Sequence, residues 1–94
     1  MTAYVYIVKC ADNTLYTGWT TSLVRRVRVH NQGKAAKYTR ARRPVELVYW
    51  ERLDSKVAAL QREWEIKQLT RAEKLALCNM KLKYLLRERG DETT

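Results

Sequence analysis

Two short segments on either side of a turn signal constrain the fold of this chain more than any other feature. Residues 4–9 (YVYIVK) and 14–19 (TLYTGW) are rich in the β-branched and aromatic residues that favour strands. Between them, residues 11–13 (ADN) contain the Asp-Asn pair that is typical of tight turns. The pattern predicts a β-hairpin near the start of the chain.

The predicted hairpin also determines which side chains share a face of the sheet. A three-residue loop centred on Asp12 places Tyr6 opposite Gly18 and diagonal to Tyr16. The two tyrosine rings then lie close enough to bracket one small group. Because Gly18 has no side chain, we expect it to leave the space beside them open.

The remaining segments predict one more strand and several helices. In chain order we expect a helix over residues 23–33 that follows the hydroxyl residues 20–22, a basic loop over 34–44, a strand over 45–51, a helix over 56–69, and a last helix that opens with a capping box at 70–73 and ends near 90. Strands followed and separated by helices, with short connections, indicate a small α+β domain with a three-stranded antiparallel sheet flanked by helices. We expect a single domain over residues 1–90 and a disordered tail over 91–94.

The positive charge of the chain is concentrated in one stretch. Nineteen lysines and arginines against ten aspartates and glutamates give a net charge of +9. No acidic residue lies between Asp12 and Glu46, a stretch that we call the basic window. A local excess of positive charge suits a polyanion, because each neutralised phosphate releases condensed counterions. The window therefore predicts contact with nucleic acid, the alternative being a merely soluble basic face. Its eight basic residues are Arg25, Arg26, Arg28, Lys34, Lys37, Arg40, Arg42 and Arg43.

Aromatic residues outside the hairpin admit two interpretations. Tyr38, inside the basic window, could stack on a nucleobase or pin its loop to the domain. We expect Trp19, Trp50 and Trp64 in the core or at its edge, because a small domain relies on a few large aromatic residues. Stacking on bases is the alternative for these tryptophans.

Composition disfavours several classes of protein. There is no run of about 18 apolar residues, and the first residues lack the charged and then apolar layout of a secretory signal. The two cysteines, Cys10 and Cys78, are too few for a disulfide scaffold and lack zinc-binding spacing, so we expect buried free thiols. We therefore expect a soluble cytoplasmic protein, or one associated with the nucleoid, that does not bind membranes.

The paired tyrosine motifs resemble a known signature. Residues 4–6 (YVY), followed ten positions later by residues 16–18 (YTG), resemble the paired motif of the GIY-YIG nuclease superfamily. The resemblance covers roughly residues 3–78 and is closest to the small stand-alone, UPF0213-like branch of the superfamily. Two positions depart from the motif, because Tyr4 replaces its first glycine and Thr17 replaces its middle isoleucine. Neither change removes a reactive side chain.

The resemblance also implies a set of site residues. The family has an arginine and often a histidine on the first helix and a glutamate on a later helix, which Arg26, His30 and Glu63 match. By this resemblance Tyr6 is the general base and Tyr16 positions the water or a phosphate oxygen. Arg26 would clamp the scissile phosphate, and His30 would accept or relay a proton. Glu63 would hold one divalent cation, Mg²⁺ or Mn²⁺, because a single acidic ligand argues against two-metal catalysis.

Glu63 differs from its neighbour Glu65 in its position on the predicted helix. At about 100° per residue, Glu63 lies about 60° from both Leu60 and Ile66, so it emerges through an apolar flank. A carboxylate directed toward packed structure needs a partner, and a divalent cation is one such partner. The alternative is an ion pair with Lys67, four residues further along the helix surface.

The sequence therefore predicts a metal-dependent endonuclease that hydrolyses DNA phosphodiester bonds, with RNA not excluded as a substrate. The alternative is a non-catalytic nucleic-acid-binding module that retains the basic window. A protein-interaction adaptor that uses the C-terminal helix is weaker, because nothing in that helix indicates a large exposed apolar face. The sequence leaves open the structure of the substrate, the need for a protein partner and the oligomeric state.

Overall fold

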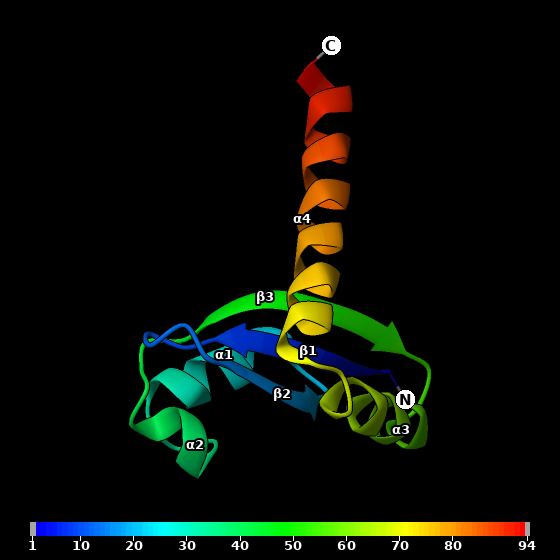
Figure 1. Ribbon diagram of the computed structural model, residues 1–94. Helices are drawn as coiled ribbons and strands as arrows, with labels where there is room; N and C mark the ends of the chain where they lie inside the picture. The colour runs from blue at the N-terminus through cyan, green and yellow to red at the C-terminus, as the bar shows by residue number, and fades with distance from the viewer. Residues whose placement is uncertain (1, 94) are drawn as a thin grey trace.

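A three-stranded antiparallel sheet forms the centre of the protein (Figure 1). The computed structural model describes residues 2–93, and its sheet has the strand order β2-β1-β3. Helices lie against both faces of the sheet, so the α+β class predicted from the sequence is confirmed. The strands are β1 (Ala3–Lys9), β2 (Leu15–Thr20) and β3 (Glu46–Leu53), and the helices are α1 (Leu23–Asn31), α2 (Lys37–Arg40), α3 (Lys56–Lys67) and α4 (Arg71–Thr93).

The hairpin of β1 and β2 has the predicted register. Tyr6 pairs with Gly18, which places Tyr6 and Tyr16 in diagonal positions on one face of the sheet. In the turn, the Asn13 amide donates to the Cys10 carbonyl at 2.9 Å. Asn13 has a φ of 68°, in the left-handed region that asparagine tolerates better than most residues. The Asp-Asn turn thus sets the register that aligns the two tyrosines.

The helices differ from the prediction in three respects. The short helix α2 forms inside the stretch that we predicted to be a basic loop, because residues 34–43 contain no glycine or proline to prevent a helical turn. Helix α1 begins after Ser22, but the Ser22 side chain makes no capping hydrogen bond. Helix α4 continues past its predicted end at Gly90 to Thr93, through most of the predicted tail. Thr94, the last residue of that tail, lies outside the described residues.

The start of α4 confirms the predicted capping box. The Glu73 carboxylate accepts from the Thr70 amide at 2.8 Å, and the Thr70 hydroxyl accepts from the Glu73 amide at 3.2 Å. These two bonds satisfy amide groups that the first turn of a helix leaves without partners. The capping box therefore fixes the residue at which α4 begins.

The sheet buries one apolar cluster on each face. Successive side chains of β1 point to opposite faces, as they do in any strand. On the face that we call the α1 face, Tyr6 packs in a cluster with Val27 of α1. On the opposite face, the α3 face, Val5 and Ile7 pack with Ile66 of α3.

Helix α4 extends away from the sheet, and its C-terminal end lies far from the other elements (Figure 1). Several of its apolar side chains are exposed, among them Met80, Leu82 and Leu86. The expectation that this helix lacks an exposed apolar face is therefore wrong. Among the described residues, no helix is both long and apolar enough to cross a membrane.

The tryptophans and cysteines only partly follow the predicted burial. Trp19 and Trp50 are half-buried, as expected for residues at the edge of the core. Trp64 is 65% exposed, so its predicted burial is wrong; it lies about 160° around α3 from the buried Ile66. Both cysteines are free thiols. Cys10 is buried, as predicted, and Cys78 is half-buried.

Candidate functional site

Tyr6 lies at the centre of the α1 face, on the middle strand of the sheet. Its side chain is buried, and the neighbouring strand places Gly18 against its ring. A Cβ atom added to Gly18 would lie 2.6 Å from Tyr6 Oη, which is too close for any unstrained contact. The space that Gly18 leaves is therefore occupied by the Tyr6 ring itself, where we had expected an open space.

A chain of hydrogen bonds runs from the Tyr6 hydroxyl into the protein. His30 Nε2 lies 2.7 Å from Tyr6 Oη, and His30 Nδ1 lies 2.8 Å from Thr39 Oγ1. The Thr39 hydroxyl donates its own hydrogen to the Ala36 carbonyl at 3.2 Å, so it accepts a hydrogen bond from Nδ1–H. We infer that Nε2 carries a free lone pair, which accepts the Tyr6 hydrogen. The chain thus places a neutral base directly on the Tyr6 hydroxyl.

Burial controls the protonation of both residues in this bond. Burial raises the pKa of Tyr6 above its ordinary value, although the hydrogen bond and charge of Arg26 oppose this effect. Burial also lowers the pKa of His30 to about 4, and the Arg26 guanidinium adds to the lowering. Tyr6 and His30 are therefore both neutral at pH 7, and the proton between them stays on Tyr6.

Arg26 is the charged member of this cluster. Its Nε donates to Tyr6 Oη at 3.3 Å. Arg26 lies one helical turn before His30, so α1 presents both side chains to the same hydroxyl group. Within the described part of the chain, the two terminal nitrogens of Arg26 have no hydrogen-bond or ion-pair partner. They are available to a phosphate, which a guanidinium group binds through parallel hydrogen bonds.

Tyr16 connects the cluster to helix α2. Its ring meets the His30 ring edge-on, with centroids 5.4 Å apart, and stacks on the Tyr38 ring at 6.0 Å. The Arg42 guanidinium lies over the Tyr38 ring at 4.0 Å and donates to the Asp12 carboxylate at 3.1 Å. Tyr38 therefore pins α2 against the hairpin, which is the structural alternative that the sequence left open.

Glu63 approaches the cluster from α3. Its side chain is 18% exposed, and Lys67 Nζ lies 3.8 Å from Glu63 Oε2. The Glu63 charge contributes to raising the pKa of Tyr6, so the two groups interact electrostatically. Glu65 points elsewhere and pairs with Arg62 at 3.1 Å. Glu63 is thus the less exposed of the two carboxylates, and it forms the ion pair with Lys67 that was the alternative interpretation.

The donors around Glu63 can be compared with the needs of a metal ion. No group of three or more His, Cys, Asp or Glu side chains among the described residues could hold a metal. The half-buried Glu63 carboxylate is a hard oxygen donor, which suits Mg²⁺ or Mn²⁺ with most of its water ligands retained. The residues therefore fit one hydrated divalent cation and do not fit a zinc site or a two-metal site.

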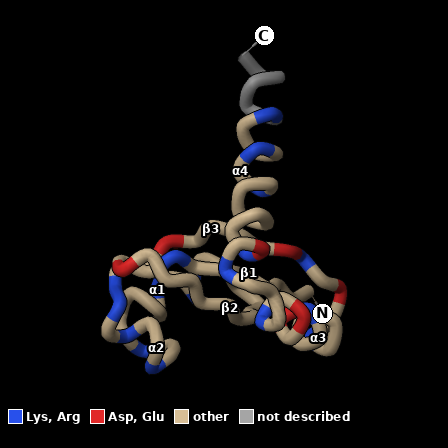
Figure 2. Tube along the Cα trace, viewed as in Figure 1, with Lys and Arg blue, Asp and Glu red and all other residues tan. Residues whose placement is uncertain are grey.

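The basic residues of the window lie on α1, on α2 and on the segments that join and follow these helices (Figure 2). Two of its arginines are engaged within the protein: Arg42 with Asp12, and Arg43 through Nε with the Arg40 carbonyl at 2.8 Å. The other exposed members have no side-chain partner in the described part of the chain and are free to contact an anion. These are Arg25, Arg28, Lys34, Lys37 and Arg40.

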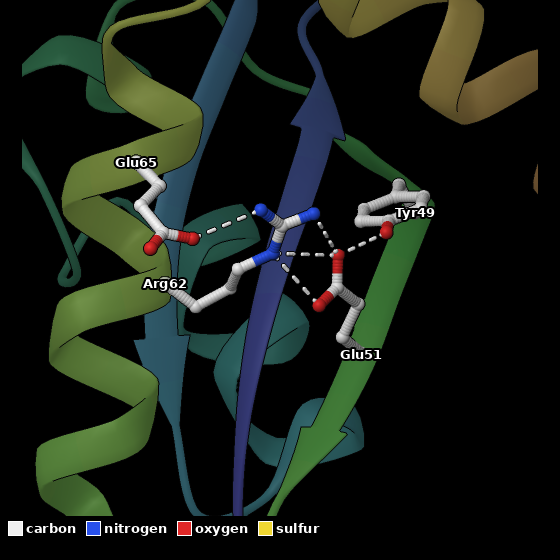
Figure 3. Close-up of polar contacts among 4 residues, drawn as sticks. All are labelled: Tyr49, Glu51, Arg62 and Glu65. Carbon is white, nitrogen blue, oxygen red and sulfur yellow. Dashed lines mark hydrogen bonds and ion pairs between the residues drawn. The ribbon is translucent and has the colours of Figure 1, made fainter.

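A second polar cluster lies on the α3 face (Figure 3). Arg62 of α3 donates to both oxygens of the Glu51 carboxylate, at 2.9 and 3.1 Å through Nε, and to Glu65 at 3.1 Å. The Tyr49 hydroxyl donates to the same Glu51 carboxylate. The cluster ties α3 to β3 and so holds the helix that carries Glu63 in place.

Two parts of this arrangement could not be predicted from the sequence. Thr39 orients His30, but in the sequence it is one polar residue in a basic stretch, with no spacing that links it to His30. Arg62 and Glu51 are eleven residues apart on different elements, so only the fold brings them together.

Most of this chain, including the candidate site, is similar to known proteins. A family model described as the GIY-YIG catalytic domain matches residues 2–76. A UPF0213 protein of Natronomonas pharaonis is 65% identical over 71 residues, covering 76% of this chain and 84% of the relative. A UPF0213 protein of Staphylococcus haemolyticus is 58% identical over 74 residues, covering 79% of this chain and 90% of the relative.

Two solution NMR structures are similar to this fold. One is the UPF0213 protein BH0048 of Bacillus halodurans, with 46% identity, a TM-score of 0.56 and 86% of each chain covered. The other is the protein EF2693 of E. faecalis, with 34% identity, a TM-score of 0.57 and 90% of this chain and 88% of that chain covered. The resemblance read from the paired tyrosine motifs is therefore confirmed, and the chain belongs to the GIY-YIG nuclease superfamily, in its small stand-alone UPF0213 branch.

Proposed function

We propose that this protein is a metal-assisted endonuclease that hydrolyses DNA phosphodiester bonds, with Tyr6 as the group that activates water. The observation that carries the proposal is the Tyr6 hydroxyl, which donates to a neutral imidazole and accepts from the Arg26 guanidinium. A phenol with a raised pKa is a poor base on its own, because its phenolate is scarce at neutral pH. Because Tyr6 can pass its own proton to His30, it can accept a proton from water without first becoming a phenolate.

The proposed reaction moves one proton along the hydrogen-bond chain. The oxygen of a water molecule attacks phosphorus and gives a proton to Tyr6 Oη, while Tyr6 passes its own proton to His30 Nε2. The bond from phosphorus to the leaving oxygen breaks, and that oxygen takes a proton from solvent. His30 becomes an imidazolium whose Nδ1–H still donates to Thr39, so no free phenolate has to form.

The negative charge of a bound substrate would make the proton transfer from Tyr6 to His30 easier than it is without substrate. The Arg26 guanidinium disfavours a second positive charge on His30 and so helps to lower its pKa. A phosphate bound to Arg26 would neutralise that charge and would reduce the cost of protonating His30. Tyr16, whose ring meets His30 edge-on, would position the attacking water or a phosphate oxygen.

Glu63 is the residue that would hold the divalent cation. When bound, the cation would supply positive charge beside the phosphate and the leaving oxygen. Lys67 would stay close to Glu63 and add to the positive charge around the phosphate.

A non-catalytic nucleic-acid-binding module is the second candidate. The observation in its favour is that five exposed cations of the basic window have no partner among the described residues, which serves binding with or without cleavage. An endonuclease would lose cleavage when Tyr6 or Glu63 is replaced, whereas a binding module would have no cleavage to lose.

The test is a cleavage assay on labelled single-stranded, duplex and branched DNA and on RNA, with Mg²⁺, Mn²⁺ or EDTA. We expect metal-dependent cleavage that Glu63→Gln abolishes with little loss of binding. Glu65→Gln is the matched control, because this carboxylate lies on the same helix, points away from Tyr6 and should leave cleavage unchanged. Binding without cleavage on all substrates and with both metals would favour the binding module instead.

A further inference from the structure

A small hollow beside Tyr16 lies outside the chain of Tyr6 and His30. It has a volume of about 250 Å³ and forms where β2, α2, α3 and the first turn of α4 meet. Tyr16 separates it from His30, because the Tyr16 ring contacts His30 and also lines the hollow. Its lining residues are Leu15, Tyr16, Thr17, Tyr38, Lys67 and Lys74.

Lys74 gives this hollow an uncompensated positive charge. Its side chain is half-buried, and within the described part of the chain its ammonium group has no hydrogen-bond or ion-pair partner. Lys67, the other cation of the lining, already pairs with Glu63 at 3.8 Å. No acidic residue lines the hollow.

Thr17 does not offer a hydrogen-bonding group to the hollow. It is 4% exposed, and its hydroxyl oxygen is buried and has no hydrogen bond among the described residues. Thr17 pairs with Ile7, so its side chain points to the α3 face, whereas Tyr16 points to the α1 face. The lysines are therefore the groups that would contact an anion in the hollow.

We propose that this hollow binds one backbone phosphate of the nucleic-acid strand, next to the phosphate that is cleaved at Tyr6. Two lysine ammonium groups, one of them unpaired, in a lining without acidic residues suit an anion with several oxygen acceptors. Tyr38 lines the hollow and belongs to α2, so the positive surface of the basic window continues across Tyr16 to α4. The strand would then lie from α2 to α4 across the site. This inference rests on the proposed action on nucleic acid and adds a subsite to it.

The test compares two lysines of α4, Lys74→Gln in the hollow and Lys83→Gln on the exposed surface of the same helix. Binding to a short fluorescent single-stranded DNA is measured in EDTA over a range of salt concentrations, so that cleavage does not affect the result. We expect Lys74→Gln to weaken binding by roughly three- to tenfold and to make the slope of log K against log salt shallower by about 0.7. Lys83→Gln should leave both quantities near those of the unaltered protein.

Two further measurements keep the test independent of folding. Lys74→Gln should not lower the melting temperature, because it removes a half-buried side chain whose charge has no partner among the described residues. Thr17→Val keeps the shape of a side chain whose hydroxyl is buried, and it should leave DNA binding unchanged. A melting temperature that falls with Lys74→Gln would indicate a structural lysine and would contradict the proposal.

The outcomes separate this inference from the proposed function. Equal binding by Lys74→Gln and Lys83→Gln would overturn the phosphate subsite, and cleavage by the unaltered protein would still support the nuclease. A selective loss of binding with Lys74→Gln would support the subsite even if no variant cleaves DNA. Absence of any DNA binding would overturn both.

Discussion

Tyr6 and Tyr49 lie on opposite faces of the same sheet, and their hydroxyl groups have contrasting partners. The Tyr6 hydroxyl donates to the neutral His30, whereas the Tyr49 hydroxyl donates to the Glu51 carboxylate. Burial raises the pKa of both tyrosines, to about 12 for Tyr49, where the Glu51 hydrogen bond and charge add to the effect. The two faces therefore differ in the partner of the tyrosine hydroxyl and not in the direction in which burial shifts the tyrosine pKa.

The partners differ in whether they can take up a proton. Burial works against the Glu51 charge, but hydrogen bonds from Arg62 and Tyr49 lower the Glu51 pKa overall, so Glu51 stays ionised. His30 is neutral at pH 7 and keeps its hydrogen bond to Thr39 if it gains a proton. The cluster on the α3 face therefore holds its charges fixed, and the cluster on the α1 face can move a proton.

The largest effect is expected when each tyrosine loses only its hydroxyl group. Tyr6→Phe should reduce cleavage by about a thousandfold, because it removes the proton acceptor for water. It should also lower the free energy of unfolding by about 1–2 kcal/mol, because the buried His30 Nε2 loses its partner. Tyr49→Phe should lower the free energy of unfolding by about 1 kcal/mol and leave the cleavage rate of the folded protein close to normal. Single-turnover cleavage and urea unfolding of both variants measure this contrast. Equal losses of activity would show that the two clusters do not differ in the proposed way.

The next effect concerns the pH dependence of stability on the α1 face. The pKa of His30 is about 4 in the folded protein and 6.5 in the unfolded chain, so only the unfolded chain gains this proton as the pH falls below 6.5. Stability that is fully present above pH 6.5 is therefore lost as the pH falls toward 4, by about 2 kcal/mol between pH 6.5 and 5.

His30→Gln is the control for that pH dependence. Because His30 is the only histidine of the chain, this variant should unfold with almost the same free energy at pH 6.5 and pH 5. Urea unfolding at the two pH values measures the difference. A wild-type protein whose stability does not change over this range would contradict a buried neutral His30.

The smallest of the three effects is expected on the α3 face. Arg62→Gln leaves the half-buried Glu51 charge without its cation and should lower the free energy of unfolding by about 1 kcal/mol, because solvent screens this partly exposed pair. Adding Glu51→Gln removes the unpaired charge, so the double variant should recover most of that loss. Urea unfolding of the two variants decides the point, and a double variant no more stable than the single one would show that Arg62 acts through packing alone.

Local signals predicted the parts of the fold that depend on neighbouring residues. The turn at Asp12 sets the pairing of Tyr6 with Gly18, and the capping box at residues 70–73 sets the start of α4. These features depend on backbone geometry over a few residues, which the sequence specifies directly. The proximity of Arg26 to His30 also followed from their spacing on α1.

Features that depend on packing between distant elements could not be predicted in the same way. The burial of Trp64 was predicted from its size, but its position on α3 directs it to solvent. The contacts of Arg42 with Tyr38 and Asp12 had no signal in the sequence, because they join residues of separate segments. Thr39 has no local signal at all, because its importance comes only from its distance to His30.

The most direct test of the account is the tautomer of His30, observed by long-range ¹H–¹⁵N NMR of the folded protein. The chain contains one histidine, so its ring nitrogens give an unambiguous pair of signals. We predict a neutral ring at pH 7 with the hydrogen on Nδ1 and a free Nε2, and a Tyr6→Phe variant in which the Nε2 signal shifts. A charged ring, or a hydrogen on Nε2, would mean that Tyr6 does not donate to His30 and would contradict the proposed proton relay.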